Sequence, residues 1–213
     1  MIKAIFFDVD GVLIPNKFLF TDELKKDYGI DVQVMLPFFL GIFHECVIGK
    51  ADVKEELAHV IQDWGWKGTV DDLMDYWFSK GSKIDEKMIE IVHILSKNGI
   101  RCFVATDQEK YRGDHFEKTL GHGQVFEQVF FSAQAGAVKR EQMYWDYVFS
   151  ILNKDASYPI LPHETMFIDD DEGKVAAVAR YGIPSYLFKD IEQFKIKLKE
   201  EQYFDEKVKR SII

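Results

Sequence analysis

Cysteine, basic charge and long apolar runs are all scarce in this sequence. Only two cysteines, Cys46 and Cys102, occur among 213 residues, which favours two free thiols in a reducing compartment over a disulfide framework. The N-terminal MIKAIFFDVDG carries acids where a signal peptide needs an uninterrupted apolar core. No apolar run approaches the ~20 residues of a membrane span. These absences predict a soluble, cytoplasmic protein that has no membrane partner.

Basic residues are outnumbered by acidic ones. The chain has 27 Lys and Arg against 36 Asp and Glu, a formal net charge of -9. A negative field of this kind repels nucleic acid, so we expect no nucleic-acid partner. It does not exclude a small anionic substrate, because a metal ion or a lysine can reverse the sign of the potential inside a pocket. The six histidines lack the spacing of a zinc site.

Apolar residues, by contrast, make up 47% of the chain, enough for a sizeable core. Short apolar runs typical of strands in a buried parallel sheet occur at residues 3–8, 101–106, 128–133, 166–170 and 184–188. Helical patterns separate or follow the later runs, at residues 85–98, 109–120, 139–152, 173–181 and 190–201. This alternation predicts an α/β fold with a doubly wound parallel sheet.

Residues 15–82 interrupt the alternation. The segment contains no strand run and has helical patterns at residues 22–28, 52–64 and 70–79. We therefore predict a small all-α domain over residues 15–82, inserted after the first strand into a core domain of residues 1–14 and 83–213. The charge-rich tail, residues 195–213, is expected to form a solvated terminal helix that frays.

Polar residues gather where the predicted strands end. In an open α/β sheet, ligands bind outside the carboxyl ends of the strands. This edge would receive Asp8, Asp10, Thr106, Lys139, Asp169 and Asp170. Crowded acids repel one another unless a cation lies among them, and Mg²⁺ usually binds one or two carboxylates together with a substrate phosphate. A hydroxyl and an ammonium group suit a phosphoryl group bound beside such a metal.

The order of these motifs resembles that of the haloacid dehalogenase (HAD) superfamily of phosphohydrolases. Its four motifs correspond here to Asp8-Val9-Asp10-Gly11-Val12, Thr106, Lys139 and the pair Asp169-Asp170. The resemblance covers most of the chain apart from the insertion. It implies a Rossmann-like core, with the inserted helices forming a cap that closes over the active site and sets specificity.

The resemblance also implies a role for each motif residue. Asp8 would attack phosphorus and form an aspartyl phosphate, and Asp10 would serve as general acid and then as general base. Thr106 would hold a phosphoryl oxygen, and Lys139 would offset negative charge. The implied Mg²⁺ ligands are Asp8, the Asp10 backbone carbonyl and Asp170, with Asp169 either a ligand or a neighbour of one.

Some residues near the motifs depart from the family pattern. Arg140 follows the motif lysine where proline is usual, and Asp107 follows Thr106 where asparagine is common. Asp107 adds an acid near the phosphate, which could alter the rate or the substrate. Arg112 could reach a substrate, but for this residue we expect a solvated helix face.

Within the insertion, residues 14–20 are expected to face the substrate, because here the chain leaves the predicted nucleophile. The apolar segment LPFFLGIFHECVIG, residues 36–49, indicates an insertion that packs on the core or presents an apolar wall. Phe39, Phe43 and His44 are further candidates for substrate contact. For each of these three, packing inside the insertion or exposure on its surface is the favoured interpretation.

Asp10 favours phosphate ester hydrolysis, because the dehalogenase members of the family lack this second aspartate. We therefore predict an Mg²⁺-dependent phosphatase acting on a small phosphorylated metabolite, with sugar phosphates as one candidate class. A phosphomutase using the same aspartyl phosphate, and a catalytically idle binding or regulatory protein, are open alternatives. The sequence does not distinguish a monomer from a homodimer.

Overall fold

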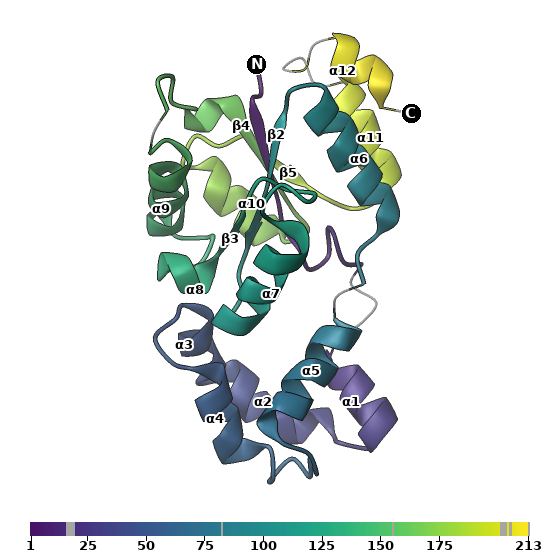
Figure 1. The fold of residues 1–213 in the computed structure, drawn as a ribbon, viewed down its shortest axis with the longest axis vertical. Coiled ribbons are helices and arrows are strands. Elements are labelled where there is room, and N and C mark those ends of the chain that lie inside the picture. The colour runs from purple at the N-terminus through teal and green to yellow at the C-terminus, as the bar shows by residue number, and fades with distance from the viewer. Residues whose placement is uncertain (16–19, 82, 155, 201–203, 205, 213) are drawn as a thin grey trace.

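A five-stranded parallel sheet forms the centre of the molecule. The computed structural model describes residues 1–15, 20–81, 83–154, 156–200, 204 and 206–212. The strands, in the spatial order β3-β2-β1-β4-β5, are β3 (Val129–Phe131), β2 (Arg101–Thr106), β1 (Ala4–Phe7), β4 (Thr165–Asp169) and β5 (Ser185–Leu187). All four neighbouring pairs are parallel. The predicted fold class is therefore confirmed, with β1 at the centre (Figure 1).

Helices cover both faces of this sheet. The side chains of β1 alternate between two apolar clusters, with Ile5 and Phe7 in one and Ala4 and Phe6 in the other, as the period of a strand requires. The first cluster packs against α6 (Glu86–Lys97), α7 (Lys110–Leu120) and α11 (Ile191–Glu200). The second packs against α9 (Gln142–Leu152) and α10 (Glu172–Ala179). Figure 1 shows α9 on one side of the sheet and α6 with α11 on the other.

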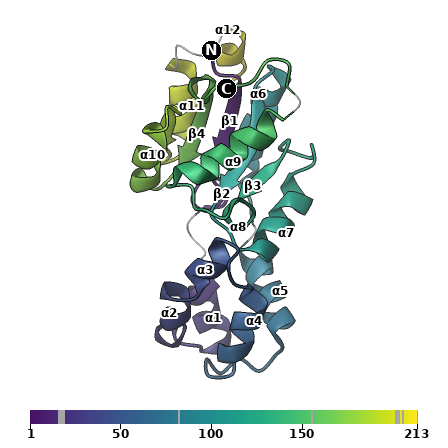
Figure 2. The ribbon, with the colours of Figure 1, turned by 90° about the vertical axis from the view of Figure 1, so that its left-hand side faces the viewer.

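The helical insertion lies beyond the carboxyl ends of the strands, far from both chain ends (Figure 2). Its helices are α1 (Phe20–Tyr28), α2 (Val32–Leu40), α3 (Phe43–Val47), α4 (Val53–Val60) and α5 (Val70–Lys80). They share an apolar cluster of their own, which includes Trp64, Trp66 and Trp77. The predicted boundaries at residues 15 and 82 stay a prediction, and residues 16–19 and 82 lie outside the described residues.

Two helices of the insertion, α2 and α3, were not predicted from the sequence. The segment VQVMLPFFL of α2 is almost wholly apolar and contains Pro37, so it lacks the apolar and polar faces by which a surface helix is identified. Asp31 caps this helix, because its carboxylate accepts a hydrogen bond from the backbone N–H of Gln33 at 2.9 Å. The predicted helix over residues 139–152 is also shorter than expected, since α9 begins at Gln142 and is preceded by the short α8 (Ser132–Ala135).

The expectation of a solvated tail is wrong for the described part of residues 195–213, while residues 201–203, 205 and 213 lie outside the described residues. Leu198 of α11 is fully buried, and Phe204 and Ile212 further along are buried as well. All three belong, with Phe194 just before the tail, to one apolar cluster of the core. α12 (Glu206–Ser211) contacts α6 and α11. Lys199, Glu200, Glu206 and Arg210 of this tail are exposed. In the sequence, the many charges conceal the apolar residues that anchor the tail. Within the described residues, no helix is long and apolar enough to cross a bilayer.

The tail can be tested with a pair of substitutions in α11. Leu198 is completely buried, whereas Ile196 is 54% exposed. We expect Leu198→Ala to lower the free energy of unfolding by about 2–5 kcal/mol, and Ile196→Ala to change it by no more than about 0.5 kcal/mol. Urea denaturation measures both values. Equal, small effects of the two substitutions would contradict the packed tail.

Candidate active site

The predicted site residues meet at one edge of the sheet because their strands are neighbours. β1 pairs with β2 on one side and with β4 on the other. Asp8 therefore follows the central strand, Thr106 ends β2 and Asp169 ends β4. The inserted helices lie beyond this same edge (Figure 2).

Lys139 joins the two acidic strand ends. Its ammonium group is fully buried and lies 2.6 Å from Asp8 Oδ1 and 2.7 Å from Asp169 Oδ2. The residue comes from the connection between α8 and α9. Its backbone N–H donates to Asp107 Oδ1 at 2.8 Å, and its carbonyl accepts from the indole of Trp145 at 2.9 Å. Burial alone would lower the pKa of Lys139, but the carboxylates around it, Asp8 foremost, outweigh burial and raise the pKa. Lys139 is therefore held as a cation.

Asp8, Asp169 and Asp170 form a compact group of acids. One carboxylate oxygen from each lies within 4.8 Å of the others. Burial raises the pKa of Asp8 to about 7, although the charge of Lys139 opposes this change. Gly11 makes room for the group, since its φ is +87° and a Cβ at this position would overlap the Asp170 carboxylate. A compact group of three carboxylates has the chemistry of a site for a hard divalent cation.

Thr106 is buried beside this group, and Gln108 connects it to Asp10. The side-chain amide of Gln108 donates to Asp10 Oδ2 at 2.7 Å and approaches Thr106 Oγ1 at 3.3 Å. Thus all six residues predicted for the site lie at one edge of the sheet. Lys139 contacts Asp8 and Asp169, and Gln108 connects Asp10 with Thr106. The roles implied by the family resemblance stay predictions.

Arg112 occupies a different position from the one expected. Its side chain is only 9% exposed and binds both oxygens of Asp10, with Nη2 2.7 Å from Oδ1 and Nη1 2.8 Å from Oδ2. Nη1 also donates to Gln108 Oε1 at 2.9 Å, and Nη2 to the Gly81 carbonyl at 3.1 Å. The prediction of a solvated helix face is therefore wrong. Gly81 follows the last helix of the insertion, so Arg112 connects that helix to Asp10.

The start of α7 fixes the direction of Arg112. Buried Glu109 caps this helix and accepts hydrogen bonds from the backbone N–H groups of Tyr111 and Arg112 at 2.7 and 2.6 Å. This arrangement keeps the first turn of α7 against the edge where β2 ends. The sequence does indicate that Arg112 lies near the site, because the helix that follows the motif strand β2 must begin close to the end of that strand. Charge alone cannot tell whether a side chain there points inward.

The charge of Arg112 changes the acidity of Asp10. Burial alone would raise the pKa of Asp10, but the guanidinium charge and the hydrogen bonds from Arg112 and Gln108 outweigh burial. The pKa is therefore held below the usual value for aspartate. At neutral pH Asp10 is a carboxylate in this arrangement.

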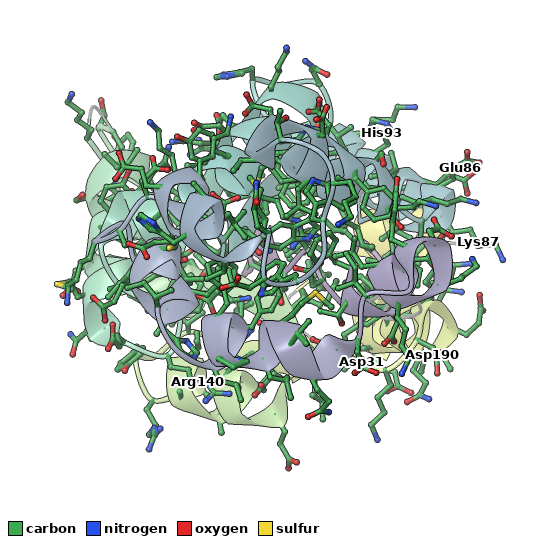
Figure 3. All side chains as sticks on the ribbon, turned by 90° about the horizontal axis from the view of Figure 1, so that it is seen from below. Asp31, Glu86, Lys87, His93, Arg140 and Asp190 are labelled. Atoms are coloured by element: carbon green, nitrogen blue, oxygen red, sulfur yellow. The ribbon has the colours of Figure 1, made fainter. Side chains whose placement is uncertain are left out.

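The two departures from the family pattern are paired with opposite charges. Asp107 Oδ2 lies 3.4 Å from Lys174 Nζ, and Arg140 Nη2 lies 2.8 Å from Asp171 Oδ2. The additional acid therefore has a cation beside it. Arg140 is half-exposed and lies away from the centre of the molecule when the insertion is viewed end-on (Figure 3).

A cavity of about 320 Å³ opens beside Asp10 and Arg112. Of the segment predicted to face the substrate, Ile14, Pro15 and Phe20 line this cavity, and residues 16–19 lie outside the described residues. Phe39 and Phe43 line it as well, although packing inside the insertion was favoured for them. His44 is exposed, as its favoured interpretation predicted.

The ion pair between Arg112 and Asp10 makes stability depend on pH. The pKa of Asp10 is lower in the folded than in the unfolded chain, so the pair stabilises the fold above about pH 4 and loses this effect as the pH falls through the folded-state pKa. The Asp10 side chain is 46% exposed, which weakens the pair by solvent screening. We expect Arg112→Met to cost about 2 kcal/mol at pH 7 and less at pH 3.

Arg140→Met is the matched control, because it removes an arginine from an exposed pair. It should cost no more than about 0.5 kcal/mol at either pH. Urea denaturation of both variants at the two pH values measures these costs. A cost for Arg112→Met that does not depend on pH would contradict the assigned pairing.

Comparisons with known proteins agree with the fold. A family model described as haloacid dehalogenase-like hydrolase matches residues 2–182, whereas no curated protein matches the chain. A predicted HAD-like family hydrolase from Porphyromonas gingivalis is similar in structure, with a TM-score of 0.70 and 23% identity over 95% of this chain and 100% of that one.

Two further solved structures are similar. A HAD family enzyme from Bacteroides thetaiotaomicron, in complex with magnesium and inorganic phosphate, has a TM-score of 0.69 and 21% identity over 91% of this chain and 99% of that one. An L-2-haloacid dehalogenase from Xanthobacter autotrophicus, with chloropropionic acid covalently bound, has a TM-score of 0.61 and 15% identity over 99% of this chain and 88% of that one. At these identities the similarity concerns the fold. The family match, which extends over most of the sequence, shows that the chain belongs to the haloacid dehalogenase-like hydrolases.

Proposed function

We propose that this hydrolase is an Mg²⁺-dependent phosphatase that cleaves a small phosphorylated metabolite through an aspartyl phosphate on Asp8. The observation that carries the proposal is the relation between Asp8 and Asp10. Asp8 is buried against Lys139, whereas Asp10, two residues later, lines the cavity. One carboxylate is therefore suited to attack phosphorus, and the other to exchange a proton with the leaving group.

The second aspartate favours phosphoryl chemistry over dehalogenation. A halide leaves without a proton, so a dehalogenase has no use for an acid beside the leaving group. An alkoxide is a poor leaving group and requires protonation. Asp10 lines the cavity, and Arg112 and Gln108 fix the direction of its carboxylate there.

Mg²⁺ is the cofactor that fits the acidic group. We assign Asp8, the Asp10 backbone carbonyl and Asp170 as its ligands. Both oxygens of Asp169 are engaged, one by Lys139 at 2.7 Å and the other by the backbone N–H of Asp171 at 2.8 Å, so Asp169 serves mainly to position Lys139. When bound, Mg²⁺ supplies positive charge for the oxygens of the phosphoryl group. The magnesium and phosphate in the Bacteroides enzyme support this choice.

The remaining residues position and neutralise the phosphoryl group. The Thr106 hydroxyl donates a hydrogen bond to a phosphoryl oxygen, and the Lys139 ammonium group offsets negative charge on Asp8 and on the transferred phosphoryl group. Asp10, held as a carboxylate by Arg112, is in the form needed to activate water in the second step. Proton donation in the first step requires this contact to weaken. The inserted helices, residues 15–82, act as the cap domain, and we assign the reaction to the cytoplasm, where buried Cys46 and Cys102 stay reduced.

Two alternatives differ in their products. A phosphomutase would pass the group from Asp8 back to a sugar, so incubation with a hexose phosphate would yield an isomer instead of inorganic phosphate. An idle binding protein would yield neither product. The complete set of Asp8, Asp10, Thr106 and Lys139 argues against an idle protein, since binding alone does not require all four groups.

Asp8→Asn tests the nucleophile. With p-nitrophenyl phosphate and Mg²⁺, we expect kcat/KM to fall by about 10³-fold or more, because the amide cannot form the aspartyl phosphate. Excess chelator should abolish turnover by the unchanged protein, and added Mg²⁺ should restore it.

Asp171→Asn is the matched control, since asparagine keeps the cap of α10 and Asp171 lies outside the acidic group. Its kcat/KM should stay within about threefold of the original. Turnover that persists in the Asp8→Asn protein would rule out the proposed nucleophile.

Asp10→Asn tests proton donation through the leaving group. Benzyl phosphate releases a basic alkoxide, whereas p-nitrophenyl phosphate releases a stable phenolate that hardly needs a proton. We expect the substitution to lower kcat/KM for benzyl phosphate about 10-fold more than for p-nitrophenyl phosphate. This ratio reports the first chemical step. An equal loss for both esters would show that Asp10 is not the general acid.

A further inference from the structure

The cavity beside Asp10 has a wall of four aromatic rings. Phe20, Phe39, Phe43 and Trp77 all line it. Trp77 is the common neighbour, with ring centroids 4.7 Å from Phe20, 5.9 Å from Phe39 and 5.8 Å from Phe43. Phe39 and Phe43 also meet edge to face at 5.2 Å. These contacts fix the rings relative to one another, so the wall is formed before any ligand enters.

Among the described residues that line this cavity, few groups are free to form further hydrogen bonds. Both oxygens of Asp10 are held by Arg112 and Gln108, and both terminal nitrogens of Arg112 have partners. The Gly81 carbonyl accepts from Arg112, and the Gly81 N–H donates to the Trp77 carbonyl. The Thr21 hydroxyl remains available, whereas Arg112 Nε has no hydrogen-bond partner but is buried out of reach of a ligand.

A polyhydroxylated leaving group does not match this environment. A hexose would bring several hydroxyl groups out of water, and each one buried without a partner costs binding free energy. An aromatic ring would instead find ring faces and edges at the distances that favour aromatic pairs. The volume of about 320 Å³ lies at the small end of ligand pockets, which suits a single ring on a short linker and not a nucleotide.

We propose that the substrate is a phosphate monoester whose leaving group is one aromatic ring joined to the ester oxygen directly or through a methylene. This inference rests on the proposed phosphatase function. The phosphoryl group lies at Asp8, Thr106 and Lys139, and the ring enters the aromatic wall. Asp10 lies between the two, since it follows Asp8 in the chain and also lines the cavity. A carboxylate oxygen of Asp8 bonds to phosphorus as the bond from phosphorus to the ester oxygen breaks, and the ring leaves as an alcohol or phenol with a proton that Asp10 takes up from solvent when its contact with Arg112 weakens. Water then attacks the aspartyl phosphate, gives one proton to Asp10 and releases inorganic phosphate from Asp8.

Benzyl phosphate and glucose 6-phosphate provide a comparison at matched reactivity, because both esters release a primary alcohol. We expect kcat/KM for benzyl phosphate to exceed that for glucose 6-phosphate by at least about 10-fold. Cyclohexylmethyl phosphate separates aromatic from merely apolar recognition and should be several-fold poorer than benzyl phosphate. Equal or better hydrolysis of either competitor would overturn the inference while leaving the phosphatase function intact.

Binding provides a readout that does not depend on turnover. Benzylphosphonate and methylphosphonate cannot be hydrolysed and differ only by the ring. With Mg²⁺ present, calorimetry should give a Kd for benzylphosphonate at least about 10-fold lower than for methylphosphonate. Equal Kd values would overturn the inference. If none of the esters is hydrolysed, p-nitrophenyl phosphate included, the proposed phosphatase function is wrong. The ratio of the two Kd values then still decides whether the cavity selects an aromatic ring.

Two phenylalanines of the insertion supply a variant and its control. Phe43 and Phe78 both pack, partly buried, against the same apolar cluster, but of the two Phe43 alone lines the cavity. Phe43→Ala should raise the Kd of benzylphosphonate about fivefold and leave that of methylphosphonate within about twofold. Phe78→Ala should leave both unchanged, and circular dichroism checks that each variant is folded. Parallel changes in the two variants would overturn the assignment of the wall.

Discussion

The site depends on one buried cation. Lys139 contacts Asp8 and Asp169 at 2.6 and 2.7 Å. Asp8 directly follows β1, and Asp169 ends the neighbouring strand β4. Without the ammonium group, two buried carboxylates would repel each other at the centre of the sheet edge, and losing one partner of a buried ion pair typically costs about 3–5 kcal/mol. The backbone of Lys139 is fixed as well, by Asp107 and Trp145. The positions of the acids therefore follow from a lysine that a different part of the chain supplies.

A second cation extends this network to the inserted helices. Arg112 contacts Asp10 and the Gly81 carbonyl at the end of α5. The group proposed to exchange protons is thus held by the same side chain that contacts the end of the insertion. A shift of α5 relative to the sheet would change the contact of Arg112 with Asp10 and hence the acidity of that carboxyl. Substrate entry and proton exchange would then be linked through one guanidinium group.

Local patterns made most of this architecture predictable. What was missed depends on long-range contacts or on segments whose composition conceals their structure. The strands and the residues Asp8, Thr106 and Asp169 follow from short apolar runs and the residues that end them, whereas Lys139 was identified from the order of the family motifs. The partner of Arg112 lies 102 positions earlier in the chain, a relation that no local pattern encodes. The helix α2 was missed because it is apolar on all sides. The burial of the tail was missed because its charges outnumber the apolar residues that anchor it.

The specificity proposed for the site depends on residues that both pack inside the insertion and line the cavity. Phe39 and Phe43 pack with Trp77 inside the insertion and also line the cavity. Because the rings hold one another in place, little conformational entropy is lost when a ligand contacts them. A side chain held by its neighbours is a better binding surface than a free one, so packing in the insertion prepares the wall for recognition. In the proposed phosphatase, the same contacts that stabilise the insertion would therefore favour a flat, apolar leaving group over a hydroxylated one.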